Sequence, residues 1–441
     1  MFSDRDIWRM ILPLFAEQFL AVFIGMTDVF VIAFVGEEAV SGVSLVNAFN
    51  VIFINLFLAL ASGGAVVISQ YMGRRDWDRA SQAASQLVTA AVLFSLAMMV
   101  LVLLLDTKLL SLLFPCVEES VMDSCITYLQ ISALSYPAMA IYNAGTAVYR
   151  SLGRTSTTLY IAIAANIINI VGDCLGVFWF HAGVAGVAWP SLLSRSVSAA
   201  VITFLCLYRS PSVRYRLSWM LYLSRDMQRR ILKIAVPNGI ESGVFQLVKV
   251  ALSTIVAMFG TYQIAANGVA QSVWSMAALT CTAMGPVFIT VIGRCMGAGD
   301  TDQAVFYMKK LLKINLVLAV VWNSLIFAVT PVILGFYSLD EETKDLIILL
   351  VLIHNLFNAL VFPFADPLGK GLRAAGDAMF TAGISLFTTI GVRMSLSLLF
   401  GFAMNLGVIG VACAMCLDWT LRGAIFWIRF KRGTWQQFRV I

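Results

Sequence analysis

The segment "QYMGRRDWDRA" occupies residues 70–80, and "GRCMGAGDTDQA", which follows the same pattern, occupies residues 293–304. A displacement of 224 residues aligns a Met-Gly pair, two Asp residues and an Ala of these segments, and it also aligns Pro13 with Pro237. The same displacement pairs "GVAGVA" at 183–188 with "GVIGVA" at 407–412. Chance produces one such match but not this series. The chain is therefore a tandem repeat whose halves are expected to fold alike.

The composition is that of a protein embedded in a membrane. Of the 441 residues, 60% are hydrophobic and only 12% are charged, and the mean hydropathy is +0.88. A helix that spans a bilayer needs about 20 apolar residues. We expect an all-α integral membrane protein with twelve transmembrane helices, near residues 11–35, 41–70, 84–105, 124–148, 157–180, 183–208, 232–258, 264–293, 309–331, 345–370, 379–404 and 407–430.

The repeat divides these helices into two groups of six. Because six is even, both halves enter and leave the membrane on the same side and are parallel repeats, related by an axis along the membrane normal. A basic stretch, "RSPSVRYRLSWMLYLSRDMQRRI", joins them. We expect a first six-helix lobe at residues 1–208, a cytoplasmic linker at 209–231 and a second lobe with a short tail at 232–441, arranged around a central cavity.

The loop charges predict the orientation of the chain. When the N-terminus is placed inside the cell, most of the 30 Lys and Arg residues fall in cytoplasmic segments, as the positive-inside rule requires. Both termini are then cytoplasmic, in the plasma membrane. The net charge of +6 reflects this topology and not nucleic-acid binding. The first apolar run is long enough to span, so we interpret it as a retained helix and not as a signal peptide.

Neither a cofactor nor a resident metal is expected. The eight Cys residues lie in or beside the predicted spans, and only two His residues are present. This distribution favours Cys as a small apolar packing residue over redox or metal chemistry.

Polar side chains of several helices of the first half lie at one predicted depth. Asp28 and Asp173 each lie about 10 Å below the outer end of their helix, at 1.5 Å per residue. Asn47, Asn50 and Ser191 reach a similar level on neighbouring predicted helices. A charge at the centre of a bilayer costs roughly 2.5 to 3.5 kcal/mol on insertion scales. A functional role is therefore favoured for the two carboxylates, and the substrate cavity is expected to be lined by Asn47, Asn50, Asn166 and Tyr128.

The predicted fifth helix carries its polar residues on one face. Asn166, Asn169 and Asp173 follow an i, i+3, i+7 spacing, which places them on one side of a helix, while the opposite side is Ile, Val and Leu. A polar stripe in a membrane helix faces other helices or water. Packing between helices is the alternative role for the Asn residues, and such contacts contribute about 0.6 kcal/mol on average.

The second half does not repeat the two carboxylates. The residue aligned with Asp28 is Leu252, and the residue aligned with Asp173 is Ser397. Residues that serve only the common fold tend to remain symmetric after duplication. The asymmetry therefore predicts a cation site in the first lobe.

Other charges within the predicted spans have two interpretations. Glu17 and its repeat partner Glu241 could bind cationic substrates in an inward-facing cavity, or they could be symmetric structural carboxylates. Lys249 lies close to the face of Glu241 and is expected to form an ion pair with it or with another helix. Three further charged residues are expected to form ion pairs within the second lobe: Arg393, Asp418 and Arg422.

The two Gly-Asp loops quoted above, together with "LRAAGD" at 372–377 and "VAMFGTYQIAANGVA" at 256–270, resemble the multidrug and toxic compound extrusion (MATE) family over nearly the whole chain. The resemblance implies a secondary antiporter that exports bulky, often cationic organic molecules in exchange for Na⁺ or protons.

The resemblance also implies roles for particular residues. Asp28 matches the acidic residue of the family's first helix, and Asn169 with Asp173 matches the Asn-x-x-x-Asp of the fifth, both of which serve cation coupling. Ser191 matches a hydroxyl that completes the site, and Tyr128 matches an aromatic residue of the fourth helix. Members coupled through the second lobe carry carboxylates at two positions that here hold aromatic residues, Phe245 and Phe362.

Together these observations predict a transporter and not an enzyme. Two carboxylates close together in a low dielectric cannot easily both remain ionised unless a cation neutralises them. A proton would serve, and Na⁺ could be held by Asp28, Asn169 and Asp173; the residue types do not choose between them. We expect a monomeric H⁺- or Na⁺-coupled antiporter for amphipathic, drug-like compounds. A flippase for lipid-linked substrates is the alternative, ahead of a membrane enzyme or a channel, because no catalytic motif is present.

Overall fold

The structure is a computed structural model that describes residues 2–114, 117–210, 212–335, 340–438 and 440–441. Over these residues every regular element is a helix. The chain divides into two compact units, which are Asp4–Gly239 and Met1–Ser3 with Ile240–Ile441. We call them the first and the second unit.

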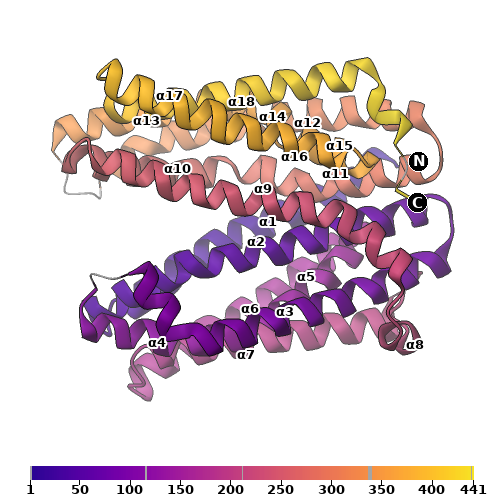
Figure 1. The fold of residues 1–441 in the computed structure, drawn as a ribbon, viewed down its shortest axis with the longest axis horizontal. Coiled ribbons are helices and arrows are strands. Elements are labelled where there is room, and N and C mark those ends of the chain that lie inside the picture. Colours follow the sequence, from indigo (N-terminus) through magenta and orange to yellow (C-terminus); the bar gives the residue numbers. More distant parts are fainter. Residues whose placement is uncertain (1, 115–116, 211, 336–339, 439) are drawn as a thin grey trace. The chain divides into compact units, whose positions relative to one another are not determined.

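The first unit is built of long helices that run side by side (Figure 1). In order, its elements are α1 (Asp4–Ile32), α2 (Glu37–Gly73), α3 (Trp77–Leu113), α4 (Glu119–Leu134), α5 (Tyr136–Ser151), α6 (Thr155–Cys174), η1 (Leu175–Trp179), α7 (Ala185–Phe204), η2 (Leu205–Arg209) and α8 (Leu217–Leu221). The elements η1 and η2 are widened π-helical turns that extend α6 and α7.

The second unit repeats this plan with more interruptions. It begins within α9 (Arg225–Ala257) and continues with α10 (Thr261–Ala277), α11 (Leu279–Gly297), α12 (Thr301–Leu334), α13 (Glu341–Leu360), α14 (Phe362–Ala365), α15 (Pro367–Ala375), α16 (Ala378–Leu386), η3 (Phe387–Met394), α17 (Ser395–Leu398), η4 (Leu399–Ala403), α18 (Gly407–Arg432) and η5 (Thr434–Gln437). The breaks around α14 follow from Pro363 and Pro367, because proline interrupts the helical hydrogen-bond pattern.

The predicted membrane fold is confirmed. Eleven helical stretches of the described chain are long and apolar enough to cross a bilayer. The predicted span at 124–148 is covered by two shorter helices, α4 and α5, which meet at Ser135 just before Pro137. That break explains why this span does not count as a single long helix.

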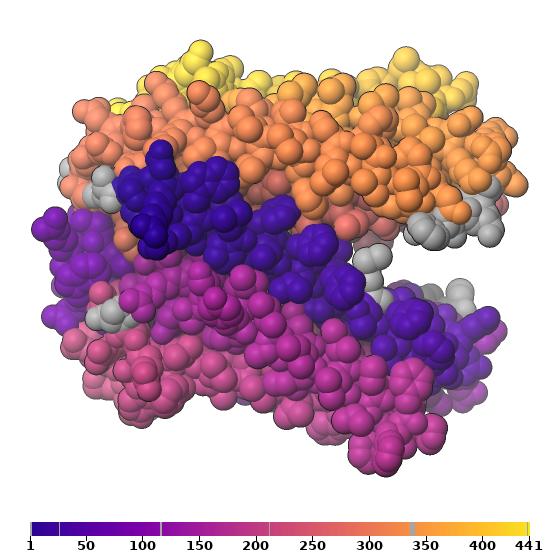
Figure 2. Space-filling model, turned by 180° about the vertical axis from the view of Figure 1, so that it is seen from behind, coloured from indigo at the N-terminus to yellow at the C-terminus, as the bar shows by residue number. Residues whose placement is uncertain are grey.

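Close packing of η1, the extension of α6, against α7 depends on two glycines. A Cβ atom added to Gly176 would lie 2.0 Å from the carbonyl oxygen of Gly186, and one added to Gly186 would meet the backbone of Gly176. Small residues at such crossings let helix backbones approach within a membrane. The helix α1 lies along the other side of α6, as the indigo and magenta surfaces of Figure 2 show. The helix α6 is thus held between α1 and α7.

The repeat is visible in individual contacts. Asp76 Oδ1 accepts a hydrogen bond of 3.0 Å from the amide of Arg79 at the start of α3, and Asp300 Oδ1 accepts one of 2.9 Å from Gln303 at the start of α12. Each Asp is an N-cap, which satisfies an amide that has no partner within its helix. The two segments that reveal the repeat in the sequence therefore form the same turn between consecutive long helices.

Each unit also contains the same ion pair. Arg150 donates to Glu17 at 2.8 Å in the first unit, and Arg373 donates to Glu241 in the second. A threonine contacts each ion pair. Thr158 donates a hydrogen bond of 2.9 Å to Glu17, and Thr381 accepts one of 3.0 Å from Arg373. Both pairs connect the first long helix of a unit to helices late in the same repeat.

The predicted linker at 209–231 contains α8 and the first two turns of α9. Backbone amides of this linker donate hydrogen bonds to polar side chains of α3. Ser81 Oγ accepts from the amide of Arg214 at 3.2 Å, and Ser85 Oγ accepts from the amide of Arg216 at 3.0 Å. Gln86 Oε1 accepts from the amide of Ser224 at 3.0 Å. The division between the units lies further along, inside α9 and two residues after Pro237.

We predict that Asp76→Ala and Asp300→Ala each destabilise the protein by about 1 kcal/mol, because an N-cap is lost. The measurement is the melting temperature of the purified protein in detergent. Asp302→Ala is the matched control, since it removes the same charge two residues further along, in the first turn of α12, without removing a cap, and it should lower the melting temperature by less. Equal losses in all three variants would contradict the capping role.

Candidate cation-binding site

The structure brings the predicted residues of the first unit together. Asp28 is contributed by α1, Asn169 and Asp173 by α6, and Ser191 by α7. Asp173 is fully buried, and Asn169 and Ser191 are 8% and 7% exposed. Because α6 packs against both α1 and α7, one face of α6 presents its polar residues to both neighbours.

Asn169 connects α6 to α7. Its Nδ2 donates a hydrogen bond of 2.8 Å to Asp173 Oδ2 and a longer one of 3.5 Å to Ser191 Oγ. The first bond spans four residues of one helix, which is the spacing that brings side chains over one another. Asn169 therefore orients the Asp173 carboxylate.

The two carboxylates lie within hydrogen-bonding reach of each other. Their remaining oxygens, Asp28 Oδ1 and Asp173 Oδ1, are buried and have no hydrogen-bond partner among the described residues. A buried acceptor without a partner costs about 1 to 3 kcal/mol, and more when it is charged. A proton shared by the carboxylates or a cation bound between them would remove this cost.

The side chains fit a small hard cation. Two carboxylates, an amide and a hydroxyl offer the oxygen ligands that such ions prefer. No group of three or more His, Cys, Asp or Glu side chains that could hold a metal ion occurs in the described chain. The oxygen ligands of the carboxylate site suit a proton or an alkali ion that enters and leaves.

Arg195 is a neighbour of this site that the sequence analysis did not place there. Its charge acts on both Asp28 and Tyr128, and its Nη1 donates a hydrogen bond of 2.7 Å to Ser135 Oγ. Within the described ranges it forms no ion pair. The signal was available, because Arg195 lies one helical turn after Ser191 and so shares its face.

The other polar residues predicted at this depth form a second set of contacts. Tyr128 donates to Asn47 Oδ1 at 3.2 Å, and Tyr136 donates to Asn50 Oδ1 at 2.7 Å. Asn50 in turn donates to Ser132 at 3.1 Å. These bonds join α2 to α4 and α5. Asn166 is half-buried and makes no hydrogen bond to the residues that the structure describes.

Glu17 and Glu241, the other two predicted cavity residues, are engaged in the ion pairs described above. Glu17 is 8% exposed, and both of its oxygens accept hydrogen bonds, from Arg150 and Thr158. These contacts are what the structural interpretation of the pair expects. Substrate binding by either residue stays a prediction.

The second unit differs at the equivalent positions. Arg393 replaces Asn169 and contacts Asp418 at 2.7 Å, and Asp418 also contacts Arg422 at 2.7 Å. The predicted ion pairs of this unit are thus present. The expected ion pair of Lys249 is not, because Glu241 pairs with Arg373 and the Lys249 ammonium contacts no carboxylate of the described residues.

A duplicated bundle of membrane helices with buried carboxylates in one repeat is an architecture that membrane transporters use. The MatE family model matches residues 13–175 and 237–399, which begin at the two aligned prolines. The chain belongs to the MatE family, and its predicted membership is confirmed.

Several relatives are similar over nearly the full chain. "Uncharacterized transporter YisQ" of Bacillus subtilis is 25% identical over 96% of this chain and 93% of its own length. "Probable multidrug resistance protein NorM" of Thermotoga maritima is 23% identical over 99% and 94%. A crystal structure of MATE in the straight conformation has a TM-score of 0.90 at 17% identity, with 97% of this chain and 95% of that chain covered. The fold of this chain is therefore the MATE fold.

We predict opposite stability effects for two carboxylate substitutions in the first unit. Asp28→Asn should stabilise the Na⁺-free protein by roughly 1 to 3 kcal/mol at an alkaline pH where the carboxylates hold no shared proton, because it removes repulsion between two nearby negative charges. Glu17→Gln should destabilise it by roughly 3 kcal/mol, because Arg150 loses the partner of a largely buried ion pair.

The measurement for both variants is thermal unfolding of the purified protein in Na⁺-free buffer. Glu241→Gln is the control from the second unit and should behave like Glu17→Gln. A lower melting temperature for Asp28→Asn would mean that the carboxylate pair supports the fold.

Proposed function

We propose that this protein is an antiporter that exports amphipathic, often cationic organic compounds by alternating access, driven by H⁺ or Na⁺ bound at Asp28 and Asp173. Asn169 and Ser191 complete the cation site. The observation that carries the proposal is the facing pair of carboxylates, each with one buried oxygen that has no hydrogen-bond partner among the described residues.

Charge counting supports one bound cation. Asp28 and Asp173 carry two negative charges when ionised, and Arg195 supplies one positive charge close by. One H⁺ or Na⁺ then makes the cluster neutral, and a second would leave it positive. In a medium of low dielectric the neutral state is strongly preferred.

Cation binding can then control the conformation through α1 and α6. Occupancy joins Asp28 on α1 to Asp173 on α6, whereas the empty site separates two like charges. A cation that binds one arrangement of these helices more tightly shifts the population toward it. If the substrate prefers the other arrangement, binding of the two ligands is coupled and reciprocal. The two ligands therefore exchange.

The substrate class rests on the relatives. The NorM relative carries a name that describes multidrug resistance, and we transfer that activity to this chain as part of the proposal. The positive-inside distribution of Lys and Arg supports a plasma-membrane location with both termini cytoplasmic. We further propose that the protein acts as a monomer, with Tyr128, Asn47 and Asn50 near the substrate path.

We predict that Asp28→Asn and Asp173→Asn each reduce gradient-driven export by at least about tenfold, because the cation loses a charged ligand. The assay is uptake of ethidium into inside-out proteoliposomes, under a pH gradient alone and under a Na⁺ gradient alone. The gradient that drives the wild type identifies the coupling ion.

Ser397→Ala is the matched control for these variants, since Ser397 is the repeat equivalent of Asp173. It should transport like the wild type. Full gradient-driven transport by Asp28→Asn would refute the coupling role, while equal loss in Ser397→Ala would indicate a general packing defect.

A further inference from the structure

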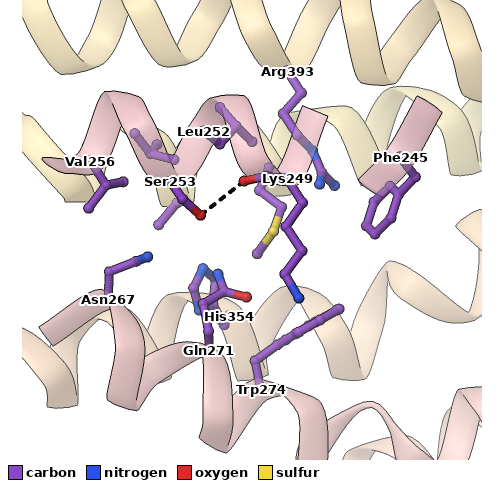
Figure 3. A pocket seen from close by; sticks show the side chains of 13 residues that line it. Phe245, Lys249, Leu252, Ser253, Val256, Asn267, Gln271, Trp274, His354 and Arg393 are labelled. Carbon is purple, nitrogen blue, oxygen red and sulfur yellow. Dashed lines mark hydrogen bonds between the residues drawn. The ribbon is translucent and has the colours of Figure 1, made fainter. Parts of the chain in front are cut away.

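A pocket in the second unit has a polarity opposite to that of the carboxylate site. It lies between α9, α10, α13, η3 and α18 and has a cavity volume of about 80 Å³. Figure 3 shows the side chains of Lys249, Asn267, Gln271, His354 and Arg393 directed toward its interior. No Asp or Glu is among the lining residues.

The cations of the pocket are not balanced by acids. Asp418 is fully buried and is shared by two arginines, Arg393 and Arg422, each at 2.7 Å. That group alone carries a net charge of one positive unit. Lys249 adds a second positive charge, because the nearest acid on its own helix, Glu241, is already paired with Arg373. The interior therefore holds an excess of positive charge.

Several buried donors in the pocket also lack partners. His354 is 1% exposed, and neither of its ring nitrogens makes a hydrogen bond within the described part of the chain. Arg393 is 4% exposed, and its Nε is likewise unpartnered. The indole nitrogen of Trp274 is buried and donates to no acceptor among the residues that the structure describes. Buried donors in native proteins are nearly always satisfied, so these three point to a missing acceptor.

We propose that this pocket binds an anionic oxygen group, a carboxylate or a sulfonate, carried by an amphipathic organic substrate. The guanidinium of Arg393 and the ammonium of Lys249 supply charge, and a carboxylate accepts charge-assisted hydrogen bonds from both types of donor. Asn267 and Gln271 supply amide donors on the opposite wall. Lys249 is exposed, so it can meet a group that arrives from outside the pocket.

The size of the pocket limits what it can hold. Sites that enclose a whole drug-sized molecule have volumes of roughly 300 to 1,000 Å³, several times that of this cavity. A terminal acidic group fits, with the apolar body of the molecule outside. Leu252, Val256 and Phe245 lie at the same wall of α9 and offer an apolar surface next to the charge.

This inference rests on the proposed function only for the identity of the ligand as an exported compound. It adds molecules that carry an acidic group, including zwitterions, to the cationic compounds of the proposed function. The binding step needs no gradient and no cation at Asp28, so it can be tested separately.

The test is equilibrium binding of rhodamine B, a zwitterion with one carboxylate, and of its methyl ester, which lacks that charge. Fluorescence anisotropy is measured with the purified full-length protein in an uncharged detergent. We expect the wild type to bind rhodamine B about tenfold more tightly than the ester, as one charge-assisted hydrogen bond allows. Equal affinities, or tighter binding of the ester, would overturn the proposal.

Variants then test whether Lys249 causes the preference for rhodamine B over its ester. Lys249→Gln should weaken rhodamine B about tenfold and leave the ester unchanged, while Lys249→Arg should retain the preference. Lys313→Gln removes the same charge from an exposed position on α12 and should change neither affinity. A preference that survives in Lys249→Gln would place the anion elsewhere and refute the assignment.

A lipid headgroup is the other source of the same chemistry. Binding is therefore repeated in nanodiscs of phosphatidylcholine and of phosphatidylglycerol. We expect similar rhodamine B affinities in both. If phosphatidylglycerol abolishes binding in the wild type, the pocket is occupied by lipid and the assignment to a substrate is wrong. Whether Asp28→Asn loses coupled transport tests the proposed antiport. That result does not bear on these binding measurements.

Discussion

The cost of a charge in a low-dielectric interior governs this structure. A bilayer offers no water to buried ions, so each must be paired, neutralised or placed where a ligand can neutralise it. Most buried charges follow the first course: Glu17 with Arg150, Glu241 with Arg373, and Asp377 with Arg429 at 2.8 Å. Against this background of pairing, the buried charges of the described spans that lack a partner of opposite charge are the ones that we propose bind ligands.

The duplicated fold makes these exceptions easier to recognise. Both units keep the N-cap at the turn before the third long helix of the repeat, and both keep the Glu–Arg pair. These contacts serve what the repeats share, which is the packing of six spans. Asp28 and Asp173 have no acidic counterparts in the second unit, where Leu252 and Ser397 occupy the aligned positions. The fold does not require a carboxylate at either position.

Sequence reasoning reached the fold because its signals are local. The length of an apolar run predicts a span, and an offset that aligns Pro13 with Pro237 predicts a repeat. The break at Ser135 is harder to foresee, since a proline within a membrane helix can also be accommodated by a kink. The proximity of Asp28 and Asp173 could be anticipated from their equal predicted depth in the membrane, because all the helices cross the same bilayer.

The surroundings of the candidate site could not be anticipated in the same way. Depth does not say which helix faces which, and so Arg195 was not connected with Asp28. Lys249 was expected to pair with Glu241 because eight residues separate them along one helix. That expectation was wrong, because Glu241 forms its ion pair with Arg373, which is distant in the sequence. Ion pairing among helices is decided by tertiary packing, which spacing along one helix does not contain.

The unpaired charges of the two units have opposite signs, and this difference has a mechanistic consequence. In the first unit, two carboxylates against Arg195 leave one negative charge; in the second, Asp418 against Arg393, Arg422 and Lys249 leaves two positive charges. An exchanger must release one ligand when it binds the other. If both units attracted cations, a cationic substrate could bind at either. Under the proposed function, the opposite polarities confine the coupling cation to the first unit and direct an acidic group, where the substrate carries one, to the second. The proposed asymmetry of the repeat would thereby separate two ligands that identical units would bind alike.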